Sequence, residues 1–387
     1  MRIAMIGQKG LPARFGGVEA QVEQLTLRLV RQGFFVTVYS RAWYTKQREP
    51  MTNGVHIVYL PSLHTKHFDT ITHAFFSTIH AMTHGYDIIH YHGVGPALVS
   101  MLPRIFTPRI RVITTFHSID RKQKKWGLIA RWFLKLGEWC TTHVAHTTIA
   151  VSDTLVKYIR STYRREAIYI PNGITVPDTS LSINHYNTWS LVPQQYLLTV
   201  SRLIPDKGIH YLITAYKTLC HTAPHLMRKL PLVIVGDDCY TKQYADTLKT
   251  LARGANIIFT GFQSGNALQT LYANAKIFIH PSDSEGMPTA VLEAMSFSLP
   301  VLVSDIPEHQ KLISDPDYQF ARGQATALAK QLMTILQAPA ETLTDMGAQN
   351  RKTVATLYNW DTIIEQYRRL YQTTMETPVT AEVGLTV

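Results

Sequence analysis

The chain alternates short apolar runs, typical of buried strands, with longer segments whose apolar residues recur at helical spacing. Seven such runs fall in the first half, at residues 2–7, 34–40, 55–60, 86–92, 111–117, 147–152 and 167–173. Five more fall in the second half, at residues 196–201, 231–236, 256–261, 276–282 and 300–305. Strands that alternate with helices form mainly parallel sheets covered by helices. The pattern therefore predicts two α/β units in tandem.

The boundary between the units is expected in residues 174–193, which are polar, bracketed by proline and without apolar periodicity. We predict a first domain over residues 1–180 and a second over residues 190–357. An amphipathic helix is expected at 358–375, and residues 376–387 have the composition of a loose tail. A chain of 387 residues that is 45% hydrophobic is long enough for two cores.

Residues 280–300 combine the end of a buried strand, a polar loop and the start of a helix. The loop contains Ser282, Glu285 and Gly286, and the helix begins near Pro288 and carries Glu293. The glycine permits another molecule to approach the backbone closely. Carboxylates beside a helix N-terminus are suited to a ligand that has both hydroxyl and anionic groups. A surface loop with a structurally paired glutamate would show the same pattern, and this alternative stays open.

Two basic residues, Arg202 and Lys207, follow the first strand of the second unit. A guanidinium holds a phosphate at two points and an ammonium adds a point charge, so together they would neutralise a diphosphate. The first unit opens similarly, with a glycine-rich basic loop at residues 8–17 before a helix expected at 18–32. A nicotinamide-binding domain would look alike, but the loop is too long for G-x-G-x-x-G. Arg41 stands where NAD would require an acidic residue, which leaves only an NADP-dependent oxidoreductase open.

The excess of positive charge lies in the first half of the chain. The formal net charge is +11, and residues 1–180 hold 22 Lys and Arg against 10 Asp and Glu. Such an excess suits an acidic membrane surface or a phosphorylated substrate. Signatures of nucleic-acid binding are missing from the sequence, so we expect no nucleic-acid partner.

Residues 121–139 join six basic residues to aromatic and aliphatic ones, which predicts a helix at a lipid interface. The residues expected to contact lipid are Lys124, Lys125, Trp126, Arg131 and Trp132. A core-facing stripe is the alternative. No apolar run reaches the roughly 18 residues that cross a bilayer, and Met1 leads directly into a strand. We therefore expect a cytoplasmic protein at the inner face of the membrane.

The 17 histidines raise the question of a metal site. His80 and His84 have helical spacing, and His90 and His92 share one strand face. An HExxH motif and acidic partners are missing from the sequence around them. The sequence therefore predicts no metal cofactor.

The two glutamates eight positions apart, with the glycine and proline between them and the sequence LEAM at 292–295, resemble the E-x7-E signature of retaining glycosyltransferases of family 4. The similarity extends from Lys9 to the helix at Trp360. Residues 9–170 are most similar to the bacterial branch that builds surface polysaccharides, including rhamnosyltransferase-like members. The resemblance implies a GT-B fold, with two Rossmann-like domains facing across a cleft and the last helix packing back on the first domain.

The resemblance also implies an activity, the transfer of a hexosyl or rhamnosyl group, with retention, from a nucleotide diphosphate sugar to a glycan or lipid-linked acceptor. It implies catalytic roles for Glu285, His117, Arg202 and Lys207. Glu293 would hold the ribose diol of the donor. The implied donor pocket consists of Gly16, Gly17, Arg202, Lys207, Phe262, Ser282, Glu285, Gly286, Met287 and Glu293. Two alternatives remain, a GT-B nucleotide-sugar epimerase and a non-catalytic scaffold of the same fold.

Overall fold

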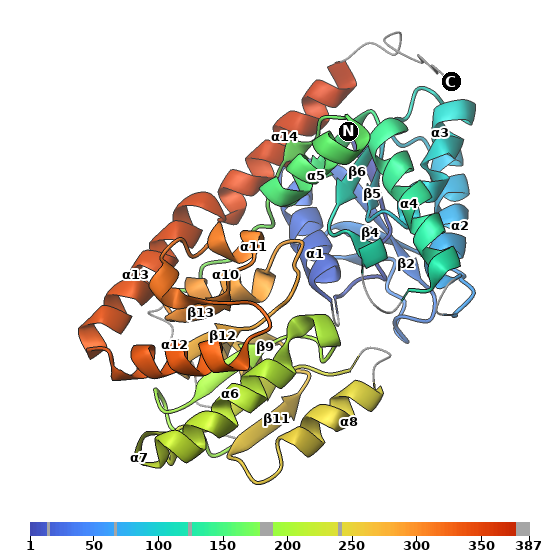
Figure 1. Ribbon diagram of the computed structural model, residues 1–387. Coiled ribbons are helices and arrows are strands. Elements are labelled where there is room, and N and C mark those ends of the chain that lie inside the picture. The colour runs from blue at the N-terminus through green and yellow to red at the C-terminus, as the bar shows by residue number, and fades with distance from the viewer. Residues whose placement is uncertain (14–15, 66–67, 123–125, 179–188, 239–241, 377–387) are drawn as a thin grey trace. The chain divides into compact units, whose positions relative to one another are not determined.

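The computed structural model describes residues 1–13, 16–65, 68–122, 126–178, 189–238 and 242–376 (Figure 1). The chain divides into two compact units. Unit 1 consists of Met1–Gly173 and Trp360–Val387, and unit 2 of Ile174–Asn359. The predicted tail, apart from its first residue, and residues 179–188 of the predicted linker lie outside the described residues.

Unit 1 is built on an eight-stranded sheet in which β3 is antiparallel to its neighbour and the other strands pair in parallel. Apolar residues of the strands alternate between two cores, one on each face of the sheet. In spatial order the strands are β3 (Met51–Thr52), β4 (Val55–Leu60), β2 (Phe35–Arg41), β1 (Arg2–Ile6), β5 (Ile88–His92), β6 (Arg111–Phe116), β7 (Thr147–Ala150) and β8 (Ile168–Tyr169).

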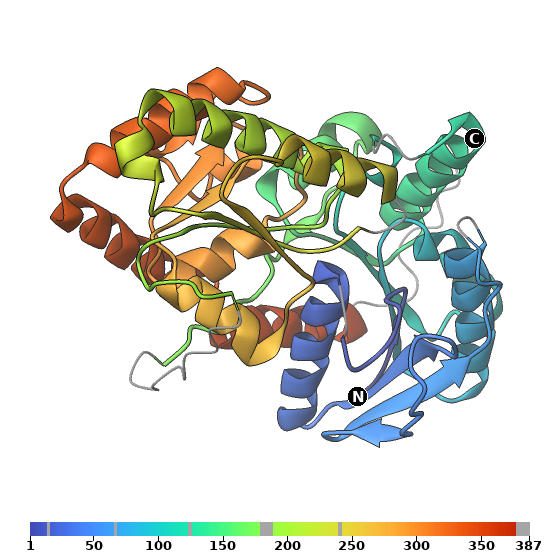
Figure 2. The same cartoon turned by 90° about the horizontal axis from the view of Figure 1, so that it is seen from below.

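The helices of unit 1 cover both faces of this sheet. On one side α1 (Gly17–Arg31) packs beside α14 (Trp360–Glu376), the last helix of the chain (Figures 1 and 2). Trp360 anchors that helix, because its ring lies under the Arg28 guanidinium and against the backbone of Gly173. The remaining helices are α2 (Asp69–Thr83), α3 (Met101–Phe106), α4 (Leu128–His143) and α5 (Asp153–Tyr163), with the short turns η1 (Pro96–Ser100) and η2 (Asp120–Lys122).

Unit 2 is built on a six-stranded parallel sheet. Its order is β11 (Ile257–Gly261), β10 (Leu232–Val235), β9 (Leu197–Val200), β12 (Ile277–His280), β13 (Val301–Ser304) and β14 (Gln319–Phe320). The first three strands run outward in one direction from β9 and the last three in the other from β12. Doubly wound sheets of this order bind ligands at the carboxyl ends of the strands where the order reverses, here between β9 and β12.

Helices on both faces of the second sheet enclose two apolar cores. They are α6 (Ile209–Thr222), α7 (Pro224–Met227), α8 (Lys242–Leu251), α9 (Gly265–Asn274), α10 (Thr289–Ser296), α11 (Pro307–Gln310), α12 (Ala325–Gln337) and α13 (Ala340–Leu357), with the turns η3 (Pro205–Lys207) and η4 (Pro316–Tyr318).

The twelve predicted strands are all present, and two-residue β3 and β14 were missed because they are too short to show a period. The helix predicted at 121–139 was misplaced. The observed helix α4 begins at Leu128, since Gly127 before it is extended, and runs to His143. Pro288, near which α10 was predicted to begin, is the N-cap of that helix. Such shifts of a few residues arise because helix ends depend on caps more than on apolar spacing.

Candidate functional site

Lys207 and Glu285 meet at the point where the strand order of unit 2 reverses. Lys207 lies on the loop after β9, and Glu285 on the loop after β12. Their charged groups form an ion pair of 2.5 Å between Nζ and Oε1, with only 15% and 7% of the side chains exposed. The parallel pairing of β9 with β12 brings together two residues that are 78 positions apart.

Gly208 explains why the two loops approach so closely. Its φ is +65°, and a Cβ at this position would lie 2.0 Å from the carbonyl oxygen of Pro281. The backbone N–H of Asp283 also donates to the carbonyl of Asp206 at 2.9 Å. Glycine is therefore required here both for its conformation and for space, and it holds the lysine loop against the glutamate loop.

The Glu285 carboxylate is held ionised. Burial alone would raise its pKa, but the Lys207 ammonium and a hydrogen bond from His280 outweigh burial and hold the pKa well below its usual range. His280 Nε2 donates to Oε1 at 2.8 Å, the same oxygen that Lys207 contacts. Oε2 has no hydrogen-bond partner among the described residues. That oxygen is consequently available to accept a hydrogen bond from a ligand hydroxyl.

Two histidines that the sequence analysis did not single out support this carboxylate. Burial lowers the pKa of His280 and lowers that of His309 to about 3, so both rings are neutral at physiological pH. His309 Nδ1 donates to the carbonyl of Ser304 at 3.0 Å. The other ring nitrogen, Nε2, therefore carries a lone pair, and it is buried without a hydrogen-bond partner in the described chain. The sequence HPS at the end of β12 was a usable signal for His280, whereas nothing in the sequence indicated His309.

The side chains of His280, Glu285 and His309 place three ligand atoms within 4.8 Å of one another, a geometry compatible with a metal ion. The Lys207 ammonium, however, lies 2.5 Å from the carboxylate of this group. A divalent cation there would be repelled by the ammonium at close range. We therefore interpret the group as a lysine–carboxylate site supported by neutral histidines.

Glu293, the second predicted glutamate, lies on α10 and has a different environment. Its Oε2 accepts a hydrogen bond of 2.9 Å from the Tyr272 hydroxyl. Burial raises the pKa of Glu293, and the bond from Tyr272 partly offsets that effect. Tyr272, on α9, was not identified from the sequence, because its helix gives no indication of which residue it will meet. Among the described residues, no hydrogen bond joins Glu293 to Glu285.

The other predicted residues of unit 2 occupy the same loops or a neighbouring one. Arg202 is exposed on the β9–α6 loop, and its guanidinium is free of partners in the described chain. Ser282 is buried, with its hydroxyl 3.2 Å from His280 Nε2. Gly286 and Met287 are partly exposed between Glu285 and α10, and Phe262 is half exposed after the edge strand β11.

The glycine loop of unit 1 forms the start of α1. Gly16 has a φ of +105°, and its Cα faces the Glu19 carboxylate so closely that a Cβ would lie 2.1 Å from Oε2. Gly17, the first residue of the helix, is exposed. The buried Glu19 also accepts a hydrogen bond of 3.3 Å from the backbone N–H of Lys9. The positive φ therefore favours glycine at 16, and the neighbouring Glu19 is an acidic side chain that the sequence analysis did not use.

His117, predicted to act from unit 1, follows β6 beside a second histidine. Its Nε2 lies 3.3 Å from Nδ1 of the buried His92, and the two rings stack. Burial lowers the pKa of His117 to about 4. His90, one layer deeper, bonds to the Tyr371 hydroxyl and to Thr115. The histidines at the carboxyl ends of β5 and β6 are therefore neutral and hydrogen-bonded.

Comparison with known proteins identifies the family of each half of the chain. The sequence profile of the group 1 glycosyl transferases matches residues 190–353, and that of Glycosyltransferase Family 4 matches residues 15–176. The chain is a glycosyltransferase in which a family 4 domain is followed by a group 1 domain. It is 24% identical to O-antigen chain mannosyltransferase C of Escherichia coli over 392 residues, which cover 97% of this chain and 99% of the relative.

Solved structures show that this glycosyltransferase has the GT-B fold. Sucrose-phosphate synthase from Thermosynechococcus elongatus superimposes with a TM-score of 0.78 at 22% identity, over 97% of this chain and 99% of that one. Anabaena Alr3699/HepE, in complex with UDP and glucose, gives a TM-score of 0.77 at 18% identity, over 96% and 100% of the two chains. The fold expected from the E-x7-E resemblance is confirmed.

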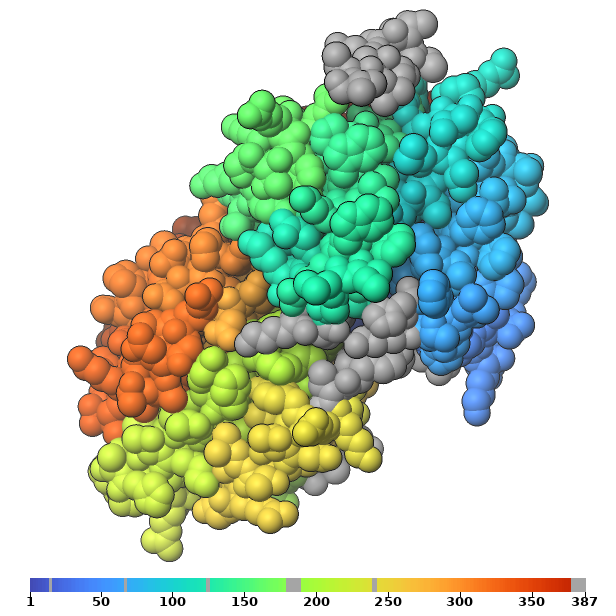
Figure 3. All heavy atoms as spheres, turned by 45° about the vertical axis from the view of Figure 1, so that its right-hand side comes forward, coloured from blue at the N-terminus to red at the C-terminus, as the bar shows by residue number. Residues whose placement is uncertain are grey.

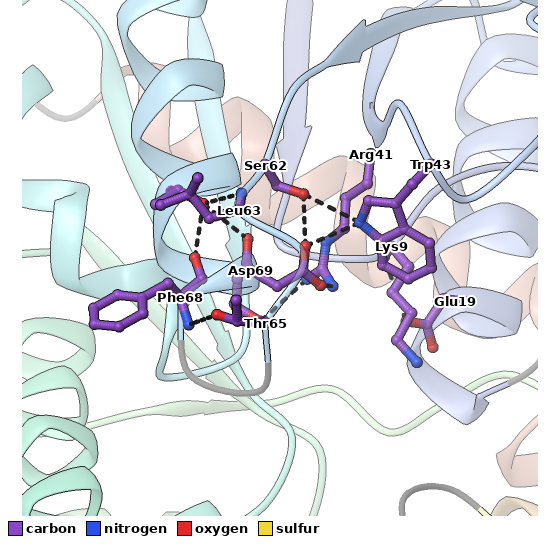
Figure 4. Close-up of polar contacts among 11 residues, drawn as sticks. Lys9, Glu19, Arg41, Trp43, Ser62, Leu63, Thr65, Phe68 and Asp69 are labelled. Atoms are coloured by element: carbon purple, nitrogen blue, oxygen red, sulfur yellow. Dashed lines mark hydrogen bonds and ion pairs between the residues drawn. The ribbon is translucent and has the colours of Figure 1, made fainter.

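In the glycosyltransferase, Arg41 has a structural role that removes the support for NADP. Its guanidinium is buried and forms an ion pair with Asp69 at 2.5 Å (Figure 4). The same carboxylate accepts hydrogen bonds from Trp43 at 3.0 Å and from Ser62 at 2.6 Å. A guanidinium paired in this way is not presented to a ribose phosphate.

The predicted lipid-contacting residues of the glycosyltransferase lie at the start of α4 or just before it. Arg131 and Trp132 lie on the helix and face a cavity lined by Arg121, Lys122, Arg131, Trp132 and Lys135. Trp126 is partly buried, and Lys124 and Lys125 lie outside the described residues. Among the residues described, no helix is long and apolar enough to cross a membrane.

Proposed function

We propose that this enzyme transfers a hexosyl group, with retention of configuration, from a nucleotide diphosphate sugar to a glycan or lipid-linked acceptor of a cell-surface polysaccharide. The observation that carries the proposal is the largely buried Lys207–Glu285 pair at the switch point of the second sheet. Comparison with the O-antigen mannosyltransferase supports both the sugar-transfer chemistry and the polysaccharide context.

The cationic residues would bind the diphosphate. Lys207 is fixed by Glu285, whereas Arg202 on the same loop is exposed and able to reach a phosphate. As the sugar departs, negative charge develops on the diphosphate, and cations already in place stabilise it without reorganisation. We assign this stabilisation to both residues.

The two glutamates would bind hydroxyls at opposite ends of the donor. Glu285 is ionised and has one oxygen without a partner among the described residues, which suits it to a sugar hydroxyl. Glu293 is oriented by Tyr272, which suits it to the ribose diol. A carboxylate with one oxygen already bonded offers the other in a fixed direction, so each glutamate would also position the donor.

Unit 1 would contribute the remaining groups. Gly17 exposes a helix N-terminus, and the lack of a side chain at the exposed Gly16 would let a ligand approach the backbone closely. A neutral His117 would donate or accept one hydrogen bond to the transferred sugar and would not act as an acid. Since no described side chain is an evident general base, the leaving phosphate would accept the proton of the acceptor hydroxyl. Phe262, Ser282, Gly286 and Met287 would complete the donor pocket.

The donor is identified by thermal-shift screening against UDP-, GDP-, dTDP- and ADP-sugars, with GDP-mannose and dTDP-rhamnose as the decisive pair. A bound donor raises the apparent melting temperature by mass action. Product is then followed by NMR, which reports the anomeric configuration. A product formed without any acceptor would indicate an epimerase, and failure of every donor to bind would indicate a scaffold.

The roles are tested with Arg202→Ala and Glu293→Ala, with Arg253→Ala as the matched arginine control. Arg202 and Arg253 are both exposed, so neither substitution should alter folding. We expect loss of about a hundredfold or more in kcat for Arg202→Ala, a rise in donor KM for Glu293→Ala, and wild-type kinetics for Arg253→Ala. Wild-type rates in the first two variants would overturn the assignment.

A further inference from the structure

Exposed apolar side chains are concentrated on one part of unit 1. In the described chain, 20 large hydrophobic residues are exposed, and 14 of them lie between Leu63 and Trp139. Twelve belong to three helices. They are Phe75, Phe76 and Ile79 on α2, Met101, Ile105 and Phe106 on α3, and Leu128, Ile129, Trp132, Phe133, Leu136 and Trp139 on α4. We name the outer surface of these three helices the apolar face.

The three helices form one layer on the same side of the first sheet. The turn η1, which runs directly into α3, packs against both α2 and α4. Ala74 and Ala81 of α2 face the sheet, so the neighbouring Phe75 and Phe76 point away from it. Figure 3 shows α4, α3 and α2, in teal, cyan and blue, adjoining on the surface of unit 1. The exposed side chains consequently look outward from one continuous surface.

The first turns of α4 lie outside the core. Leu128, Ile129 and Trp132 are 83%, 77% and 62% exposed, whereas the buried residues of this helix begin only at Gly137. Gly137 fixes that end, because a Cβ there would lie 2.3 Å from the carbonyl oxygen of Val94. Apolar area of this extent is unfavourable in water and marks a contact surface.

Cations border the apolar face. Among the described residues between 63 and 139, six Lys and Arg side chains are at least partly exposed, against two Asp. Arg121, Lys122, Arg131 and Lys135 line one cavity around Trp132. The fully buried Glu138 holds Arg121 there with a hydrogen bond of 3.1 Å. A pocket of cations beside an indole is suited to the phosphate of a lipid headgroup, with the ring at the level of the headgroups.

Two further apolar residues extend the apolar face at the N-terminus of α2. Leu63 and Phe68 are exposed beside the carboxylate network centred on Asp69, on the side away from Arg41 and Trp43 (Figure 4). The N–H of Leu63 donates to Thr72 at 3.0 Å, and that of Phe68 to Thr65 at 3.2 Å. These bonds fix the backbone at both residues, so their side chains are held in solvent by the fold.

We propose that the apolar face, together with its cation pocket, docks on the surface of a bilayer that contains anionic phospholipid. The apolar side chains of α2, α3 and α4 enter the interface, and Lys122, Arg131 and Lys135 bind lipid phosphates. The excess of cations selects a membrane over a second copy of this chain, because two copies would bring like charges together. The proposal deepens the proposed function by bringing the enzyme to lipid-linked acceptors, but docking itself does not depend on sugar transfer.

The test is co-sedimentation of the full-length protein with vesicles of phosphatidylglycerol and phosphatidylcholine, compared with phosphatidylcholine alone. Binding is expected to the anionic vesicles and to weaken with salt. Ile129→Glu on α4 and Ile105→Glu on α3 should each lower the partition coefficient about tenfold or more. Leu357→Glu, at a residue 56% exposed in unit 2, is the matched control and should bind as wild type. Equal binding of Ile105→Glu and wild type would overturn a docking face that spans three helices.

The charge contribution is tested with the double variant Arg131→Glu/Lys135→Glu, with Lys249→Glu in unit 2 as the control. The double variant should lose about tenfold or more in affinity for anionic vesicles, whereas the control should not change. Sedimentation velocity without lipid should show a monomer, and a dimer abolished by Ile129→Glu would overturn the proposal. Donor binding by thermal shift is measured in parallel. Intact donor binding without vesicle binding refutes docking alone, and vesicle binding without donor binding refutes the proposed function alone.

Discussion

Replacement of Lys207 by methionine isolates the electrostatics of the candidate site. The substitution keeps most of the volume but removes the ammonium that lies 2.5 Å from Glu285. It leaves an ionised carboxylate that is 7% exposed, with only His280 as a hydrogen-bond donor. Breaking a buried pair in this way costs about 3–5 kcal/mol, and we expect about 3 kcal/mol because the histidine bond remains.

The pH dependence follows from the direction of the Glu285 pKa. In the wild type this pKa is lowered, so the pair stabilises the fold above the unfolded pKa of about 4.3 and loses that effect as pH falls through the folded pKa. Without Lys207, burial dominates and raises the pKa, so the folded variant becomes less stable as pH rises above about 4.3. The difference in unfolding free energy should thus be largest near neutral pH and shrink toward pH 4.

The assay is urea unfolding at pH 7.5 and pH 4.5, with Lys249→Met as an exposed-lysine control expected to fall within about 0.5 kcal/mol of wild type. The double variant Lys207→Met/Glu285→Gln buries no uncompensated charge and should be more stable than Lys207→Met, with a coupling free energy of about 2 kcal/mol. A variant as stable as wild type at pH 7.5, or losses that simply add in the double variant, would refute the reasoning.

Three further predictions concern the geometry around this pair. Gly208→Ala should lower kcat/KM about a hundredfold, because a Cβ would meet Pro281 and displace the lysine loop. The control Gly254→Ala, with φ +77° but open space around it, should lower stability only. Equal kinetics for the two variants would contradict the close approach of the loops. Tyr272→Phe should raise the pKa of Glu293 further, so donor affinity should be lost on acidification at a higher pH than in wild type. If donor affinity has the same pH dependence in both proteins, the Tyr272 hydrogen bond does not lower the pKa of Glu293. His117, with a pKa of about 4, should contribute no inflection to kcat/KM between pH 6 and 8; an inflection in this range that His117→Asn removes would contradict a neutral histidine.

The sequence by itself determined the layout of the fold. Short apolar runs and intervening helical stretches are local signals, and they identified twelve strands and two α/β units. The E-x7-E spacing and the basic loop likewise predicted ligand-binding residues at the ends of β12 and β9. Local patterns of this kind survive folding because they report which face of each element must be buried.

Only the tertiary structure decided which groups meet. Sheet order placed Lys207 against Glu285, and Gly208 set their separation, which no spacing along the chain reveals. The lone pair of His309 and the Tyr272 bond to Glu293 come from helices that carry no signal of their partners. The apolar residues of α4 are indistinguishable in sequence from a core stripe, and their exposure depends on where Gly137 allows the helix to pack. Contacts between distant segments are set by the packing of whole elements. Which side chains interact can therefore be determined only from the tertiary structure.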